Sequence, residues 1–144
     1  TESHHTANNR EDMDFLIREL KRHRDKEGLL MANFVDFDSM YGHRRNAQGY
    51  AQCLEDFDAM LGELLPLLQD DELLMITSDH GNDPTMSGTD HTREEVPLVA
   101  YSPGLTESTD LGTRLTFADL GQTIMDNFDA GKLPFGTSFL NDLK

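Results

Sequence analysis

The chain alternates between segments in which apolar residues have helical spacing and short runs that are almost wholly apolar. Apolar residues that recur every three or four positions between charged ones predict a first helix ending by Gly28 and a second ending near Pro66. A third helix is expected from Thr116 to about Phe128, because Thr116 and Asp119 have the spacing of a capping box. The apolar positions of the first two helices are Met13, Leu16, Ile17 and Leu20, and then Tyr50, Leu54, Phe57, Leu61, Leu64 and Leu65.

Three short apolar runs lie outside these helices and are expected to be strands. Residues 29–35 read Leu-Leu-Met-Ala-Asn-Phe-Val, which suits a strand buried on both faces. Residues 73–77 and 96–101 are the other two, and Pro97 suits the start of a strand or a sheet edge. Helices that alternate with such strands favour an α/β fold with a parallel sheet and right-handed crossovers. The segment from Asp129 onward is expected to be loop.

Acidic residues outnumber basic ones, 27 to 12, which gives a formal net charge of -15. This balance argues against a nucleic-acid-binding surface, which needs a clustered basic face. It also means that a phosphorylated substrate approaches against a repulsive field, so arginines or metal ions must hold it locally.

Cys53 is the one cysteine of the chain, which excludes an internal disulfide bond and a thiolate metal cage. A single thiol is compatible with a reducing compartment, so the cytoplasm is the expected location. No apolar run approaches the roughly 18 residues of a membrane span, so we expect no membrane partner. The chain opens without an initiator methionine, and we expect that it begins partway through a longer protein.

Carboxylate and imidazole side chains follow two of the expected strands. They are Asp36, Asp38 and His43 after the first run, and Asp79 and His80 after the second. Because ligands gather at the carboxyl ends of parallel strands, we expect all five side chains at one edge of the sheet. Carboxylate oxygen and imidazole nitrogen without sulfur suit manganese, zinc or magnesium, and two such ions about 4 Å apart clamp the oxygens of a phosphoryl transfer. A capped turn or a surface ion pair is the alternative explanation of each Asp-His pair.

Three stretches of the sequence resemble one enzyme family. They are NFVDFDSMYGHRR (33–45), TSDHGNDPTMSGTDHTREEVPLVAYSPG (77–104) and TFADLGQTI (116–124). From about Thr6 to about Phe128, with spacings intact, the chain resembles the C-terminal part of the phosphopentomutase family within the alkaline phosphatase superfamily. The cofactor-independent phosphoglycerate mutases share the Asp-His-Gly-Asn stretch but are less similar around GHRR and GTDHTRE.

The resemblance implies an alkaline-phosphatase-like, three-layer α/β/α fold with a mostly parallel sheet. Residues 1–144 are then a single domain, the C-terminal part of the metal-binding catalytic core, without the cap domain and the N-terminal core segment.

The resemblance also implies two manganese ions, with zinc or magnesium as alternatives because the same ligands take zinc readily. It assigns Asp38, His43 and His91 to one ion. It assigns Asp79 and His80 to the other. His91 must return to the first ion after the chain has left the second, which the glycines and small polar residues of the loop allow.

Acidic and basic residues beside these ligands are expected to support them. Asp36 lies two residues before Asp38 and projects to the same side if the strand continues, so we expect it to hold a ligand histidine or Arg44 in place. Arg44, Arg45 and Arg93 are candidates for substrate binding, because a guanidinium can grip a phosphate with two parallel hydrogen bonds. Structural salt bridges to acidic residues are the equally open alternative for these arginines.

Members of the phosphopentomutase family interconvert ribose or deoxyribose 1-phosphate and 5-phosphate through a phosphorylated threonine and a bisphosphate intermediate. The resemblance implies that this threonine, an early aspartate and the cap domain lie upstream of the region represented here. We therefore expect that this chain contains no catalytic nucleophile and shows no turnover by itself. We expect its substrate to be a pentose phosphate and its partner to be the missing N-terminal part of the same enzyme.

Two other interpretations of the sequence remain open. One is a metal-dependent phosphohydrolase or a phosphoglycerate-mutase-like enzyme, either of which would use the same metal scaffold. The phosphohydrolase would lack the cap that excludes water from the site. A metal-binding fragment without catalytic activity is the other, expected if the chain is complete as given.

Overall fold

The computed structural model describes residues 2–143, which divide into two compact units. The first unit comprises the chain up to Leu67 together with His80–Val96. The second unit comprises Leu68–Asp79 together with the chain from Pro97 onward. The backbone therefore crosses from one unit to the other at three points along the sequence.

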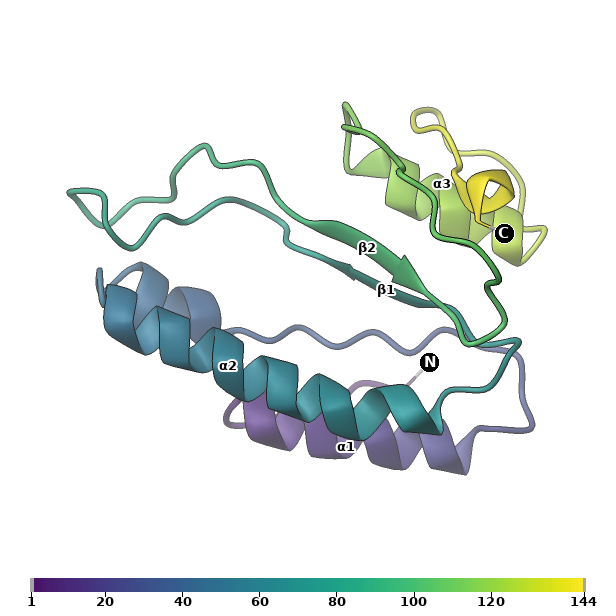
Figure 1. Ribbon diagram of the computed structural model, residues 1–144, viewed down its shortest axis with the longest axis horizontal. Helices are drawn as coiled ribbons and strands as arrows, with labels where there is room; N and C mark the ends of the chain where they lie inside the picture. Colours follow the sequence, from purple (N-terminus) through teal and green to yellow (C-terminus); the bar gives the residue numbers. More distant parts are fainter. Residues whose placement is uncertain (1, 144) are drawn as a thin grey trace. The chain divides into compact units, whose positions relative to one another are not determined.

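The first unit is built on two α-helices and a short π-helix (Figure 1). Helix α1 spans Asn9–Arg22, the π-helix η1 spans Phe37–Gly42, α2 spans Ala47–Leu64, and the 3-10 turn η2 spans Leu65–Leu67. The first and second expected helices are therefore confirmed. Asn8 caps α1 and Asn46 caps α2, each by accepting a hydrogen bond from the backbone N–H three residues further on.

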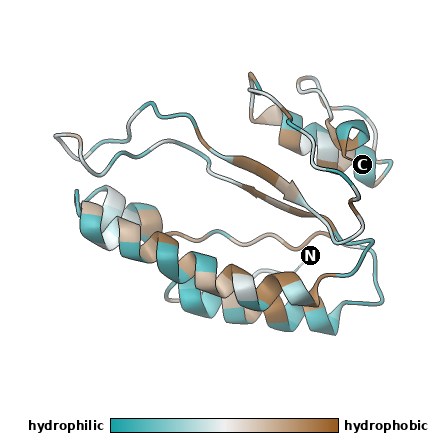
Figure 2. Cartoon of the chain, in the orientation of Figure 1, coloured by the Kyte–Doolittle hydropathy of each residue, from teal (hydrophilic) through white to brown (hydrophobic). Residues whose placement is uncertain are grey.

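Helices α1 and α2 pack through a small apolar core. Met13 of α1 is 0% exposed, and Cys53, Met60 and Leu64 of α2 are also buried. Figure 2 shows apolar residues along α2, most densely towards its C-terminal end. Burying a methionine or leucine side chain contributes roughly 1.5–3 kcal/mol, so these residues hold the two helices together.

Residues 29–35 are extended but form no strand, so the expected buried strand is wrong for this structure. Phe34 packs its ring against that of Phe57 in α2, with the ring centroids 5.0 Å apart. Met31 and Val35 are 88% and 46% exposed, so the other face of the segment is uncovered. A strand needs a neighbour that supplies the other half of the hydrogen-bond ladder, and within residues 2–143 no segment pairs with this one.

The second unit contains a two-stranded sheet and one α-helix (Figure 1). Strand β1 spans Leu74–Thr77, β2 spans Leu98–Tyr101, α3 spans Ala118–Asn127, and the 3-10 turn η3 spans Leu140–Asp142. The strands pair antiparallel, from Leu74 opposite Tyr101 to Thr77 opposite Leu98. The parallel pairing expected for this pair is therefore wrong, because a parallel pair needs a crossover, usually a helix, and no helix lies between β1 and β2.

Helix α3 begins at Ala118, two residues after the expected start, because the capping box does not form. The Thr116 hydroxyl accepts a hydrogen bond from the backbone N–H of Ala118 at 3.2 Å. The Asp119 carboxylate instead accepts from the backbone N–H of Thr137 at 2.8 Å. Aspartate is one methylene shorter than the glutamate of a capping box, and the chain after α3 supplies a donor for it. Residues 129–143 are irregular except for η3, as expected.

Polar and apolar residues alternate along all three α-helices (Figure 2). The longest of them, α2, has 18 residues and includes four acidic ones. No helix in the part of the chain that the structure describes is long and apolar enough to cross a membrane.

Candidate metal centre

Asp38, His43 and His91 lie together in the first unit, although 48 residues separate the two histidines. The Nε2 atom of His43 lies 3.2 Å from Oδ2 of Asp38 and 3.1 Å from Nε2 of His91. The Nε2 atom of His91 lies 3.6 Å from Oδ1 of Asp38. The structure therefore brings together the three residues that the family resemblance assigned to the first ion.

The π-helix η1 sets the spacing of Asp38 and His43. The backbone N–H of His43 donates to the Asp38 carbonyl at 3.0 Å, a hydrogen bond that spans five residues. This wide turn brings residues five positions apart onto the same side, whereas an α-helix would rotate them roughly 140° from each other. Single π-turns of this kind recur at functional sites.

The loop His80–Val96 carries His91 and doubles back on itself. The backbone N–H of Thr92 donates to the Gly81 carbonyl at 3.2 Å, so the two arms of the loop form an antiparallel bridge. A Cβ atom at position 81 would lie 2.6 Å from the backbone nitrogen of Glu94 and 2.7 Å from the carbonyl oxygen of Thr92. Glycine at position 81 is therefore what lets the arms approach closely enough to return His91 to Asp38.

The loop also fixes the orientation of the His43 ring. The Nδ1 atom of His43 makes a short hydrogen bond with the carbonyl oxygen of Thr89. A carbonyl oxygen only accepts, so Nδ1 carries the hydrogen and Nε2 presents its lone pair towards Asp38 and His91. A histidine ligand commonly has this arrangement, with its second ring nitrogen bonded to a backbone carbonyl.

The candidate ligand atoms of Asp38, His43 and His91 lie close enough together to hold one divalent cation. An ion about 2.1 Å from each ligand atom in tetrahedral geometry holds those atoms roughly 3.4 Å apart. The two imidazole nitrogens lie 3.1 Å apart, that of His43 lies 3.2 Å from Oδ2 of Asp38, and that of His91 lies 3.6 Å from Oδ1. With one ligand atom taken from each residue, the three atoms lie within 4.8 Å of one another. Because Nε2 of His43 presents its lone pair, Nε2 of His91 can donate a hydrogen bond to it at 3.1 Å, and a cation bound between the two nitrogens would take the place of that hydrogen.

His80 adds a third imidazole to the centre. Its ring stacks on that of His91, with centroids 3.6 Å apart and 19° between the planes. Its Nδ1 atom lies 3.1 Å from the carbonyl oxygen of Gly81. Asp79 directly precedes His80 in the chain, is exposed, and belongs to the second unit. The assignment of Asp79 and His80 to a second ion stays a prediction.

The hydrogen bonds of Asp36 among the described residues join it to α1 rather than to a ligand histidine or Arg44. Its carboxylate accepts from the backbone N–H of Asn9 at 2.9 Å, and its own N–H donates to the side-chain oxygen of Asn9 at 3.1 Å. Asp36 has helical backbone angles at the start of η1, and residues two apart on a helix do not share a side. The expectation that Asp36 holds a ligand histidine or Arg44 in place therefore remains a prediction, and no hydrogen bond among the described residues supports it.

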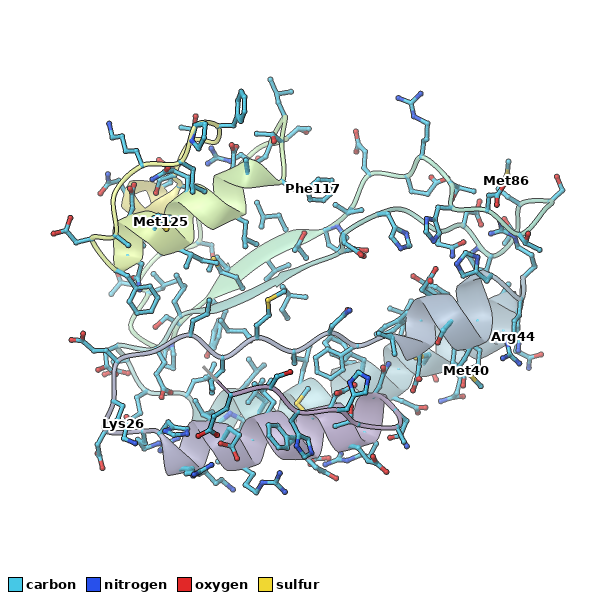
Figure 3. The ribbon with its side chains drawn as sticks, turned by 180° about the vertical axis from the view of Figure 1, so that it is seen from behind. Lys26, Met40, Arg44, Met86, Phe117 and Met125 are labelled. Atoms are coloured by element: carbon cyan, nitrogen blue, oxygen red, sulfur yellow. The ribbon has the colours of Figure 1, made fainter. Side chains whose placement is uncertain are left out.

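The three candidate arginines differ in how many of their side-chain N–H groups already form hydrogen bonds within the protein. Arg45 has four of its five N–H groups engaged by the loop. Arg44 is exposed and donates through Nε to the Ser39 carbonyl at 3.3 Å. Figure 3 shows Arg44 at the end of the first unit that also carries Met40 and the loop residue Met86. Arg93 is exposed as well. The acceptors of Arg45 are the Asn82 side chain and the carbonyls of Asp83, Gly88 and Asp90.

Sequence reasoning did not single out Asn82, although its side chain lies between two of the candidates. Its Nδ2 donates to Oδ1 of Asp38 at 2.6 Å, and its Oδ1 accepts from Nη1 of Arg45 at 2.8 Å. The sequence feature that could have pointed to Asn82 is its position two residues after His80, in the stretch Asp-His-Gly-Asn.

Asp83 holds a negative charge in the same loop. The hydroxyl and then the backbone N–H of Thr85 donate to its carboxylate and lower the pKa of Asp83 below its ordinary value, and the charge of Arg45 adds to this effect. Its backbone N–H donates to the hydroxyl of Thr92 at 2.6 Å. An ionised carboxylate near the centre favours the approach of a cation.

A second group of carboxylates and imidazole lies at α1 and has a different character. Glu2, Glu19 and His23 could also surround an ion. Arg22, however, already bridges Glu2 at 3.5 Å and Glu19 at 3.2 Å. A guanidinium thus supplies the positive charge there, and we read this group as a structural ion-pair network.

Comparison with known proteins places these residues in a family. A family model described as the Metalloenzyme superfamily matches residues 1–132. The chain is 50% identical over 143 residues to a curated phosphopentomutase from Levilactobacillus brevis. The alignment covers 99% of this chain and 36% of that protein, so the chain spans about a third of the length of the curated relative it matches. The family match implies an alkaline-phosphatase-like α/β fold, and the helices and the small sheet are consistent with part of such a fold.

Proposed function

The chain belongs to the Metalloenzyme superfamily, and on this premise we propose that it is part of a phosphopentomutase. Such an enzyme moves a phosphoryl group within a pentose phosphate and so interconverts ribose or deoxyribose 1-phosphate and 5-phosphate. The observation that carries the proposal is the meeting of Asp38, His43 and His91 in a chain 50% identical to a protein of that name.

Within this proposal, Asp38, His43 and His91 hold one divalent ion, and Asp79 and His80 contribute to a second. The ions are proposed to be manganese, although the same donor atoms suit zinc and magnesium. Bound divalent ions neutralise the charge on the oxygens of a transferring phosphoryl group. Ligands that gather cations also counter the repulsion that a chain of net charge -15 exerts on a phosphate.

The residues of this chain bind and orient, and the nucleophile is proposed to lie outside them. The Thr89 carbonyl holds the His43 ring so that Nε2 faces Asp38 and His91. Arg44 and Arg93 are exposed and are the better candidates for gripping a substrate phosphate. Arg45 is the weaker one, because the loop already engages most of its donors. The chain alone is therefore expected to show no turnover.

We also propose that the chain forms the C-terminal part of one three-layer α/β/α domain with a mostly parallel sheet. The segment 29–35 supports this, because it is extended, uncovered on one face, and without a ladder partner among residues 2–143. Pairing with polypeptide beyond this chain would make it a strand. The antiparallel pair β1–β2 is compatible with the edge of such a sheet. A cytoplasmic location belongs to the same proposal, since the single buried Cys53 suits a reducing compartment.

A chimera tests the proposed activity. The chain replaces the corresponding 143 residues of the Levilactobacillus brevis phosphopentomutase, and formation of ribose 5-phosphate from ribose 1-phosphate is measured with manganese present. We expect mutase activity within about tenfold of the parent enzyme, and a loss of at least 100-fold when the chimera carries His91→Ala, because mispositioning of reacting groups costs about that much.

Release of inorganic phosphate is measured in the same samples as a control for hydrolysis. A folded chimera that releases phosphate but forms no ribose 5-phosphate would favour the phosphohydrolase interpretation. A folded chimera without either activity would contradict the proposed function altogether.

A further inference from the structure

The Asn82 side chain has an orientation that its two partners determine. Its Nδ2 donates to a carboxylate oxygen of Asp38 at 2.6 Å, and its Oδ1 accepts from Nη1 of Arg45 at 2.8 Å. A carboxylate only accepts and a guanidinium only donates, so the reversed amide would lose both hydrogen bonds. Asn82 is half-buried, which reduces competition from water for these bonds.

The hydrogen bond from Asn82 fixes the plane of the Asp38 carboxylate. The same Oδ1 atom that accepts from Asn82 lies 3.6 Å from Nε2 of His91. The other oxygen, Oδ2, lies 3.2 Å from Nε2 of His43. Rotation of the carboxylate about its last bond would move both oxygens away from the two histidines. Asn82 therefore holds the Asp38 carboxylate in the plane in which its two oxygens face the two imidazole nitrogens.

Gly42 provides the space that Asn82 occupies. It is the last residue of η1 and is buried. A Cβ atom at position 42 would lie 2.8 Å from Cγ of Asn82 and 3.1 Å from the carbonyl oxygen of Phe37. The first contact is shorter than real Cβ atoms make, so any side chain here pushes the Asn82 carboxamide away from Asp38.

Arg45 ties Asn82 to the rest of the loop. It donates through Nε to the Gly88 carbonyl at 2.6 Å and through Nη1 to the Asp83 carbonyl at 2.7 Å, in addition to its bond with Asn82. Its backbone φ is 52°, a left-handed conformation that residues with a side chain rarely adopt. Such a conformation persists only where the surroundings hold it, and here the loop contacts do so.

We propose that Asn82 is a positioning residue for metal binding, which acts by holding the Asp38 carboxylate towards His43 and His91 from an anchor on Arg45. The inference rests on the proposed metal site at those three residues. It assigns Asn82 no contact with the ion or the substrate. It also explains why a glycine stands at position 42.

Manganese titration by calorimetry tests the proposal on the 144-residue chain. Asn82→Ala is expected to weaken manganese binding about 10- to 100-fold, the usual loss when a group that orients a metal ligand is removed. Gly42→Ala keeps every hydrogen-bonding group and is expected to weaken binding in the same range. In the variant that combines Asn82→Ala with Gly42→Ala, the added methyl group no longer meets a carboxamide. This double variant is therefore expected to bind manganese less than twofold more weakly than Asn82→Ala alone.

Asn127→Ala is the matched control, because Asn127 is an exposed asparagine at the end of α3 in the other unit. Thermal unfolding of every variant without metal separates positioning from general damage. A positioning role predicts weaker manganese binding with a metal-free unfolding temperature close to wild type. If Asn82→Ala does not fold, Gly42→Ala still tests the same contact.

The titration distinguishes failure of the proposed metal site from failure of the role proposed for Asn82. A wild-type chain that binds no manganese would overturn the proposed metal site and this inference with it. A wild-type chain that binds manganese, with Asn82→Ala and Gly42→Ala binding it within twofold of wild type, would overturn the inference and leave the metal site standing. Weakening that is fully additive in the double variant would also overturn it, because the two residues would then act independently.

Discussion

The thiol of Cys53 is protected in the fold. Burial raises its pKa to about 11, and the negative charges of Asp36 and Asp56 add to that effect. The thiolate is the reactive form of cysteine, so the buried group should be inert at pH 8. We expect Cys53 to react with a disulfide reagent at least tenfold more slowly in the folded chain than in urea. Equal rates in the two conditions would contradict its burial.

The same shift predicts how stability depends on alkaline pH. The folded pKa of Cys53 lies above the value of 9.0 for an unperturbed thiol. Below pH 9 the thiol is neutral in both the folded and the unfolded chain, so stability does not depend on it. Between pH 9 and 11 the unfolded chain loses the thiol proton first, so the free energy of unfolding falls. The urea midpoint should therefore drop between pH 8 and pH 10, and by less in Cys53→Ala. An identical drop in that variant would assign the effect to other groups.

Residue chemistry explains why part of the site could be predicted from the sequence. Asp38, His43 and His91 stand in stretches that resemble a known family, and their side chains are typical metal ligands. Asn82 and Arg45 act through hydrogen bonds to partners about 40 residues away, and no local pattern encodes such pairings. The expected role of Asp36 depended on a strand continuing past residue 35, where the chain instead turns into η1.

At the scale of elements, Asn9 joins α1 to the entrance of η1 and to α2. It is 4% exposed, its side-chain oxygen accepts from the N–H of Asp36, and its Nδ2 lies 3.5 Å from Sγ of Cys53. Asn9→Ala leaves the half-buried N–H of Asp36 without its acceptor, and the loss of such a hydrogen bond costs about 1 kcal/mol. We expect that loss in the free energy of unfolding, measured with urea.

Asn127→Ala serves as the control for this measurement, because exposed substitutions usually change stability by less than about 0.5 kcal/mol. Asn9→Ala should leave the affinity for manganese near that of wild type, since the side-chain hydrogen bonds of Asn9 among the described residues go to Asp36 and Cys53 and not to Asp38, His43 or His91. An unfolding free energy of Asn9→Ala within about 0.5 kcal/mol of wild type would contradict its role as a junction.

Helices and strands differ in how much of each the sequence could predict. The helices α1 and α2 follow from apolar periodicity and from asparagine caps, which are local signals. A strand depends on its ladder partner, which is not local. The run at 29–35 therefore stays unpaired, and the pair β1–β2 is antiparallel because the loop between them contains no crossover helix.

At the scale of the whole molecule, charge and family point to the same chemistry. A chain of net charge -15 gathers a carboxylate and two imidazoles whose ligand atoms lie within 4.8 Å of one another. Carboxylate oxygen and imidazole nitrogen without sulfur suit a divalent cation such as manganese, zinc or magnesium. The chain belongs to the Metalloenzyme superfamily and matches about a third of a phosphopentomutase, and within the proposed function a cation held by these residues would act in phosphoryl transfer.

Crystals of the chain grown with manganese chloride, with anomalous diffraction recorded above the manganese absorption edge, would show directly whether Asp38, His43 and His91 hold an ion. We expect an anomalous peak about 2.0–2.2 Å from a carboxylate oxygen of Asp38 and from Nε2 of both His43 and His91. An absent peak, or a peak bound by none of these three residues, would contradict it.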